Sequence, residues 1–146
     1  MSGSANIEAH AAPASGHTAA DLRPGRQILT VLTALALLSA TAAVAQVPAE
    51  TVDPDLARVI RFMALIKGGF ALAAFAGCFW RLARPAGSWR TLVYVAGPPL
   101  MAAGAIGLWS LHGVWIAALG LHLGLFTVLA AALTDPDFLL VTARKP

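Results

Sequence analysis

The chain has 146 residues, of which 58% are hydrophobic and only 12% are charged, and it carries a formal net charge of +3. About a quarter of the residues of a soluble domain are charged, so this composition, with a mean hydropathy of +0.74, excludes an ordinary soluble protein and indicates a membrane domain. The single cysteine, Cys78, excludes an internal disulfide, and the positive charge is interpreted as a marker of cytoplasmic loops, with no nucleic-acid partner expected.

Two interpretations are open for the N-terminal part of the chain. Residues 1–22 have no apolar periodicity and are predicted to be a disordered cytoplasmic tail. Residues 28–47 carry no charge and, at about 1.5 Å per residue, are long enough to cross a hydrocarbon core of roughly 30 Å. The same stretch ends in an A-x-A pattern at Ala43 and Ala45, which is typical of a signal-peptide cleavage site. The long polar leader and the full span length favour a retained first helix over removal of residues 1–45.

Three further spans follow, and helix start and stop signals bound them. Asp53 is a candidate N-cap with Pro54 at the first helical position, and Pro136 prevents the last helix from continuing. The sequence therefore predicts an all-α, multi-pass membrane protein, an antiparallel bundle of four transmembrane helices, or of three if the first is cleaved. The predicted membrane domain covers residues 23–134, residues 135–146 are a short cytoplasmic tail, and the spans lie at about 28–47, 59–81, 92–111 and 114–133.

Basic residues are divided unevenly between the two sides of the predicted bundle. If the helices alternate in direction, Arg58 and Arg61 lie on one side, and seven basic residues share the other: Arg23, Arg26, Arg81, Arg84, Arg90, Arg144 and Lys145. The positive-inside rule then places both termini in the cytoplasm, with the chain in a bacterial inner membrane. Tryptophans near both predicted interfaces agree with this topology.

Small residues recur at four-residue spacing on two of the predicted helices. In lipid, the close approach of small residues is a main source of helix association, because there is little hydrophobic drive between helices. These rows are interpreted either as packing seams inside the bundle or as a face for self-association or for a larger membrane partner. They comprise Gly69, Ala73 and Gly77 on the second helix, and Gly120 and Gly124 on the fourth.

Lys67 and His122 form the candidate polar site inside the membrane, because an ionisable residue within a span is costly and often functional. By the helical rise, Lys67 lies roughly 9 Å deeper than Arg61. His122 lies roughly 12 Å deeper than Val114, so the two candidates share a similar depth. Lys67 either snorkels or is structurally paired, or it is a buried cation that binds an anion or titrates. His122 is either a hydrogen-bonded neutral side chain or a proton-handling or ligand-binding one.

Gly97, Pro98 and Pro99 predict a kink in the third helix. The prolines remove two backbone donors, which leaves the carbonyl groups of Tyr94 and Val95 without their usual helical partners. A membrane bundle tolerates such a kink, and broken helices also form binding sites in transporters.

No motif for a nucleotide, a metal or a catalytic nucleophile occurs in the sequence, so catalysis has little support and no cofactor is predicted. The first hypothesis is a non-catalytic accessory or assembly subunit of a larger membrane complex, or a homo-oligomer. The second is a small transporter or a ligand- or ion-binding membrane module that uses Lys67 and His122. The third is an accessory protein of quinone or haem redox chemistry. The substrate, the partner and the oligomeric state do not follow from the sequence.

Overall fold

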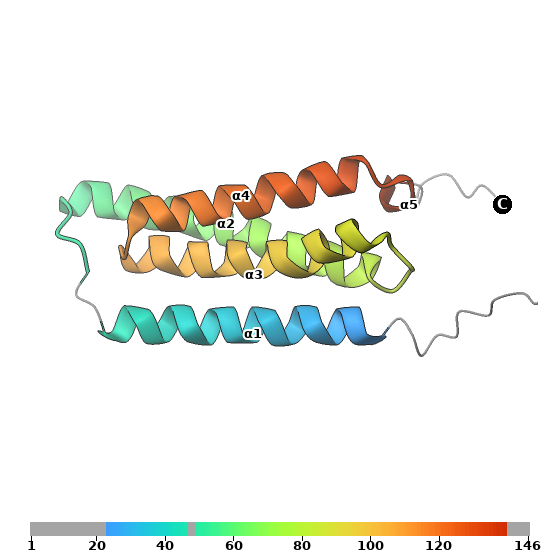
Figure 1. Ribbon diagram of the computed structural model, residues 1–146. Helices are drawn as coiled ribbons and strands as arrows, with labels where there is room; N and C mark the ends of the chain where they lie inside the picture. Colours follow the sequence, from blue (N-terminus) through green and yellow to red (C-terminus); the bar gives the residue numbers. More distant parts are fainter. Residues whose placement is uncertain (1–22, 47–48, 140–146) are drawn as a thin grey trace, which may run out of the picture.

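The computed structural model describes residues 23–46 and 49–139, and all regular structure in this part of the chain is helical, which confirms the all-α fold class (Figure 1). The tail predicted for residues 1–22 lies outside the described residues. The helices are α1 (Arg23–Gln46), α2 (Pro54–Arg81), α3 (Ser88–Ser110), α4 (Val114–Leu133) and the short α5 (Pro136–Leu139). The first four are long and apolar enough to cross a membrane, so the chain is a multi-pass membrane protein.

Asp53 is the N-cap of α2, as its sequence predicts. Its carboxylate accepts hydrogen bonds from the N–H groups of Asp55 and Leu56, at 2.9 and 3.4 Å. These bonds satisfy donors that have no partner inside the helix, and Pro54 occupies the first turn, where a missing N–H costs nothing. The start of α2 is therefore set by local side-chain chemistry.

The described residues after α4 are folded, although the sequence places residues 135–146 in a tail. Pro136 begins α5, Asp135 is fully buried, and the ring of Phe138 packs against the apolar core. The folded part therefore extends to residue 139, and residues 140–146 lie outside the described part.

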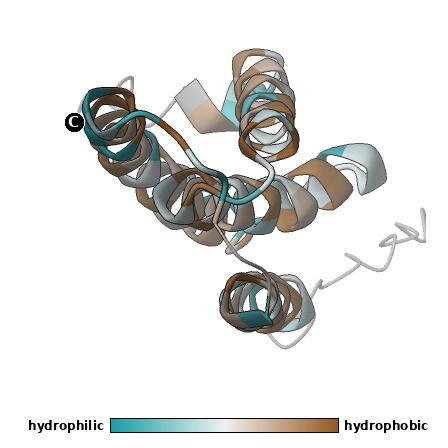
Figure 2. Cartoon of the chain, turned by 90° about the vertical axis from the view of Figure 1, so that its left-hand side faces the viewer, coloured by the Kyte–Doolittle hydropathy of each residue, from teal (hydrophilic) through white to brown (hydrophobic). Residues whose placement is uncertain are grey.

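Helix α3 lies at the centre of the fold, between α1 on one side and α2 and α4 on the other (Figure 1). Seen along the helices, α1 stands apart from the group formed by α2, α3 and α4 (Figure 2). Among the four long helices, α3 is the most buried inside the chain and α1 the least.

Helices α3 and α4 approach closely at Gly104. A Cβ atom at Gly104 would lie 2.6 Å from the carbonyl oxygen of Ala117 and 2.9 Å from the Cβ of Leu121. Glycine at this position therefore permits the close approach of α3 and α4.

The prolines do not break α3, which continues from Ser88 to Ser110 through Gly97, Pro98 and Pro99. All three of these residues are buried, and a side chain at position 97 would clash with Val128 of α4. The kink expected from the two missing backbone donors stays a prediction.

The two glycines singled out on α4 both lie towards α3. A Cβ atom at Gly124 would come within 2.8 Å of the carbonyl oxygen of Gly97 and of the Cγ of Met101. At Gly120 the nearest side-chain atoms belong to Leu100 and lie at 3.8 Å, which is an ordinary contact. Of these two glycines, Gly124 is therefore the one that permits a close approach of α3 and α4.

The row of small residues on α2 has different surroundings. A Cβ atom at Gly77 would lie 3.4 Å from the ring of Phe138, whereas one at Gly69 would meet nothing within 4 Å. Ala73, between them, is exposed. Within the described chain this row is therefore not a continuous contact between helices.

Two apolar clusters fill the bundle, one towards each end. The cluster at the end where α2 meets α3 contains Leu29, Cys78, Leu82, Tyr94, Val95, Val128 and Ala131. The cluster in the other half contains Ala64, Leu108 and Leu121. At that other end, the N–H of Glu50 donates to the carbonyl oxygen of Leu111 at 3.0 Å, which ties the α1–α2 connection to the α3–α4 turn.

Candidate functional site

The structure brings Lys67 and His122 together. Lys67 lies near the middle of α2 and His122 near the middle of α4, and the Lys67 Nζ is 3.2 Å from the His122 Nε2. Both side chains are half-buried. Helices α2 and α4 contact each other much less than either contacts α3, and the Lys67–His122 contact lies across this sparsely packed side of the bundle.

The proton arrangement of this pair follows from the second nitrogen of the imidazole. The His122 Nδ1 lies 2.6 Å from the carbonyl oxygen of Ala118, which can only accept, so Nδ1 carries the hydrogen. In the neutral imidazole Nε2 is then the acceptor, and the Lys67 ammonium group donates to it. With the imidazole neutral, the pair holds one positive charge, on Lys67.

The Lys67–His122 pair is bordered by exposed apolar side chains. Residues three or four positions apart on a helix lie on the same face, and the neighbours of the pair at this spacing include large side chains that are about half exposed or more. We call this surface the α2–α4 face; it comprises the pair with Met63 and Phe70 of α2 and Leu119 and Phe126 of α4.

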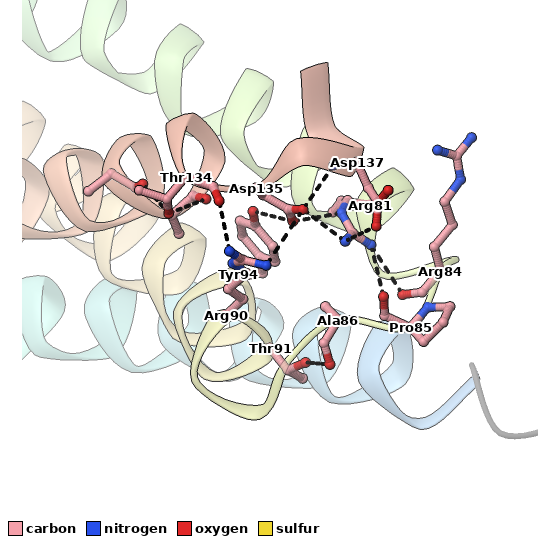
Figure 3. A network of polar contacts seen from close by, with 12 residues as sticks. Arg81, Arg84, Pro85, Ala86, Arg90, Thr91, Tyr94, Thr134, Asp135 and Asp137 are labelled. Carbon is pink, nitrogen blue, oxygen red and sulfur yellow. Dashed lines mark hydrogen bonds and ion pairs between the residues drawn. The ribbon is translucent and has the colours of Figure 1, made fainter. Parts of the chain in front are cut away.

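A second polar group lies where α2 ends and α3 begins (Figure 3). The Arg81 guanidinium donates through Nε to Asp135 Oδ2 at 2.8 Å and through Nη2 to Asp135 Oδ1 at 3.1 Å. The hydroxyl of Tyr94, from α3, donates to the same carboxylate at 3.0 Å. The Arg81 side chain is 1% exposed and that of Asp135 is 0% exposed. We call these three residues the buried clasp, since they join α2, α3 and the end of α4.

The remaining donors of Arg81 also have partners. Its Nη1 lies 3.4 Å from the carbonyl oxygens of Arg84 and Pro85, and its Nη2 lies 3.4 Å from a carboxylate oxygen of Asp137. A buried guanidinium is stable only when its charge is paired and its donors are satisfied, and Arg81 meets both conditions.

Arg90 adds a second cation at the rim of the buried clasp. Its Nη2 donates to the carbonyl oxygen of Thr134 at 2.7 Å, and its Nη1 lies 3.9 Å from Asp135 Oδ1. The Arg90 Nε is buried and has no hydrogen-bond partner in the described residues.

The carboxyl group of Asp135 is held in its ionised form. Burial alone would raise its pKa, but the hydrogen bonds from Arg81 and Tyr94 and the charge of Arg81 outweigh burial and hold the pKa below its ordinary value. Asp135 is therefore a fixed negative charge within the fold.

Sequence reasoning identified Lys67 and His122 but missed the buried clasp. The sequence indicates only that Arg81 is one of the basic residues on the predicted cytoplasmic side and that Asp135 begins the predicted C-terminal tail. The available signal was the placement of Arg81, Tyr94 and Asp135 at one predicted side of the bundle. That placement could not reveal their pairing, because the pairing depends on how each helix is rotated about its axis.

Apolar hollows flank α1 on both sides. On the α2 side two hollows share Gly68, Leu72, Ala105 and Ile106, and we call them together the α1–α2 groove. Gly69 lines this groove as well. On the α4 side two further hollows share Leu100 and Ala103. Neither Lys67 nor His122 lines any of these hollows.

The described residues contain no group of three or more His, Cys, Asp and Glu side chains that could hold a metal ion. Cys78 is fully buried in the apolar cluster described above.

No protein-family model, no curated protein and no solved structure matches this chain. No function is therefore carried over from a relative.

Proposed function

We propose that this membrane protein is a non-catalytic accessory or assembly subunit of a larger membrane complex. The observation that supports this most is the position of α1, which packs mainly on α3 and leaves the α1–α2 groove open beside it. The groove is lined by glycine, alanine and large apolar side chains, which is the surface that a second transmembrane helix packs against in lipid.

The proposed location is the inner membrane of a bacterium, with both termini in the cytoplasm. Support comes from the charges at the end of the bundle that carries the buried clasp, where Arg26, Arg84 and Arg90 also lie. An excess of arginine and lysine marks the cytoplasmic side of a membrane protein.

In this proposal α1 belongs to the mature protein. Leu29 of α1 is fully buried, and the Arg26 Nε donates to the carbonyl oxygen of Phe79 at 2.9 Å, so its removal would uncover a core position. Mass spectrometry of the mature N-terminus tests this point. A chain that begins at Gln46 would contradict it.

A small transporter or ion-binding module is the second candidate. The observation that favours it is the contact of 3.2 Å between the Lys67 Nζ and the His122 Nε2 in the middle of two spans. The hollows described above lie elsewhere, and for this reason we rank it second.

The test of the proposed function is purification of the tagged chain from its native membranes in a mild detergent. We expect a second membrane protein in a fixed ratio to it. A strictly monomeric chain that brings down no partner would contradict the proposal, and a complex that contains only copies of the chain would replace the accessory subunit with a homo-oligomer.

Two matched variants test whether the partner binds in the α1–α2 groove. Gly68→Leu places a large side chain in the α1–α2 groove, at a position where a Cβ atom meets nothing within 4 Å. Ala73→Leu makes a similar enlargement at an exposed position of the same helix that does not line the groove. We expect the first variant to release the partner and the second to retain it.

A further inference from the structure

The described residues do not satisfy all the hydrogen-bond donors of Lys67. An ammonium group has three N–H donors, and the described residues supply one hydrogen-bond partner, the Nε2 of His122. Lipid tails offer no acceptor for the other two donors. The group therefore presents both unused donors and an uncompensated charge within the span.

The four described spans have no carboxylate near Lys67 that could compensate this charge. Helix α1 contains no acidic residue, and none occurs between Leu56 and Thr134. Asp55 lies 12 residues from Lys67 along α2, which is about 18 Å, and Asp135 is already bound by Arg81. A second copy of this chain has the same spans, so it also lacks a carboxylate at this depth.

A lipid headgroup is not expected at this depth either. His122 lies eight residues after Val114, at about 12 Å from the start of α4, and Trp115 at that start is typical of an interface position. The Lys67 side chain extends across to His122 instead of towards the end of its helix. Its charge is thereby held below the headgroup region.

The surroundings of the pair fit the side of another transmembrane helix. Met63 and Phe70 are 48% and 55% exposed, and Phe126 is 61% exposed. These side chains supply an apolar contact surface around a single cationic point. The complement of that surface is an apolar helix with one acidic side chain near its middle.

We propose that the α2–α4 face binds a transmembrane helix of a different polypeptide, through an aspartate or glutamate carried at mid-membrane depth. Lys67 supplies the charge and two donors to the carboxylate. His122 positions the ammonium group by accepting its third hydrogen. This inference rests on the proposed function, since it requires that the chain works in a complex, and it specifies the chemistry of the partner.

The direct test uses a defined probe in place of the unknown partner. A labelled Leu- and Ala-rich transmembrane peptide of about 20 residues carries one central glutamate, and a matched peptide carries glutamine there. The full-length protein and each peptide are reconstituted at neutral pH in phosphatidylcholine vesicles, and association is measured by energy transfer. We expect the glutamate peptide to bind about tenfold more tightly than the glutamine peptide. Equal binding of the two peptides would overturn the inference.

Two variants locate the effect. Lys67→Met removes the charge at nearly constant volume and is expected to abolish the preference for glutamate. Arg61→Met removes a cation from the same helix about two turns away and is expected to leave it intact. A preference that survives in Lys67→Met, or that is lost equally in both variants, would contradict the assignment to Lys67.

A repeat of the experiment with an anionic lipid distinguishes binding to a helix carboxylate from binding to a lipid headgroup. The measurement is repeated in vesicles that contain phosphatidylglycerol, whose phosphate remains at the membrane surface. We expect the preference for glutamate to persist, and its loss would assign Lys67 to an anionic lipid and overturn the inference.

Failure of the inference and failure of the proposed function are distinguishable. If a partner co-purifies from native membranes but the peptides bind equally, the accessory role stands and the role of Lys67 is wrong. If the peptides show the preference but no partner co-purifies, the face binds carboxylates and the accessory role is wrong.

Discussion

Two basic side chains of α2 reach towards α4, and they are built into the protein in different ways. Arg81 is 1% exposed, has partners for its donors, and faces a carboxylate that is itself fully buried. Lys67 is half-buried, and in the described residues its ammonium group has one hydrogen-bond partner, the imidazole of His122. The first arrangement is complete within the chain, whereas the second becomes complete only with an acceptor from outside.

This difference separates a structural role from an interaction role. A buried cation with a matched carboxylate stabilises the fold only while both partners are present, because the loss of either leaves an uncompensated charge in the interior. A cation without a carboxylate contributes little to the fold of the isolated chain, and it is available to a partner. The predictions below test each side of this contrast.

The largest expected effect comes from Asp135→Ala, which removes the buried carboxylate of Arg81 and leaves only the more exposed Asp137 near it. We expect the free energy of unfolding to fall by about 3 to 5 kcal/mol. Reversible unfolding in mixed micelles measures this change. The matched control is Asp137→Ala, whose side chain is 59% exposed and lies 3.4 Å from Arg81, and its expected cost is below about 1 kcal/mol. Equal effects of the two substitutions would show that the buried clasp does not carry the stability.

Acid is expected to act on the same clasp by protonating Asp135. Because the folded pKa of this group lies below its ordinary value, its contribution to stability is complete above about pH 4 and is lost as the pH falls further. Unfolding of the wild-type protein and of Asp135→Asn is measured across the acid range. The variant is expected to be less stable and to show a flatter pH dependence there, and parallel curves would contradict the assignment.

Substitutions of two glycines are expected to change the unfolding free energy by smaller amounts, and they contrast a packed position with an open one. Gly104→Ala places a Cβ atom 2.6 Å from the carbonyl oxygen of Ala117, and we expect a loss of about 1 to 3 kcal/mol in unfolding free energy. Gly69→Ala meets nothing within 4 Å and is expected to be neutral or slightly stabilising. The same unfolding assay compares the two, and a loss at position 69 as large as that at 104 would contradict this description of helix packing.

Much of the fold was predictable from the sequence because hydropathy and caps act locally. The span of α1 and the N-cap at Asp53 can be predicted from nearby residues alone, without the positions of the neighbouring helices. The similar depth of Lys67 and His122 also followed from counting residues along two helices that enter from the same face.

What could not be predicted depends on the rotation and order of the helices. Depth alone does not make Lys67 face His122, because each side chain could point to any side of its helix. The central place of α3 depends on glycine contacts such as that of Gly104 with α4, which sequence spacing does not identify. Asp135 was missed for the same reason, since a residue in a helix-stop pattern becomes a buried partner only when Arg81 is turned towards it.

The most direct measurement of the central contrast is the unfolding free energy of Lys67→Met beside that of Arg81→Met, both in the purified chain without a partner. We predict that Lys67→Met stays within about 0.5 kcal/mol of the wild type, as expected for a substitution that breaks no complete network. Arg81→Met is predicted to lose about 3 to 5 kcal/mol, because it leaves the buried carboxylate of Asp135 with only the Tyr94 hydroxyl and the more distant Arg90 guanidinium. A loss at Lys67 as large as the loss at Arg81 would contradict the account, since Lys67 would then be part of the structural core instead of a contact held open for a partner.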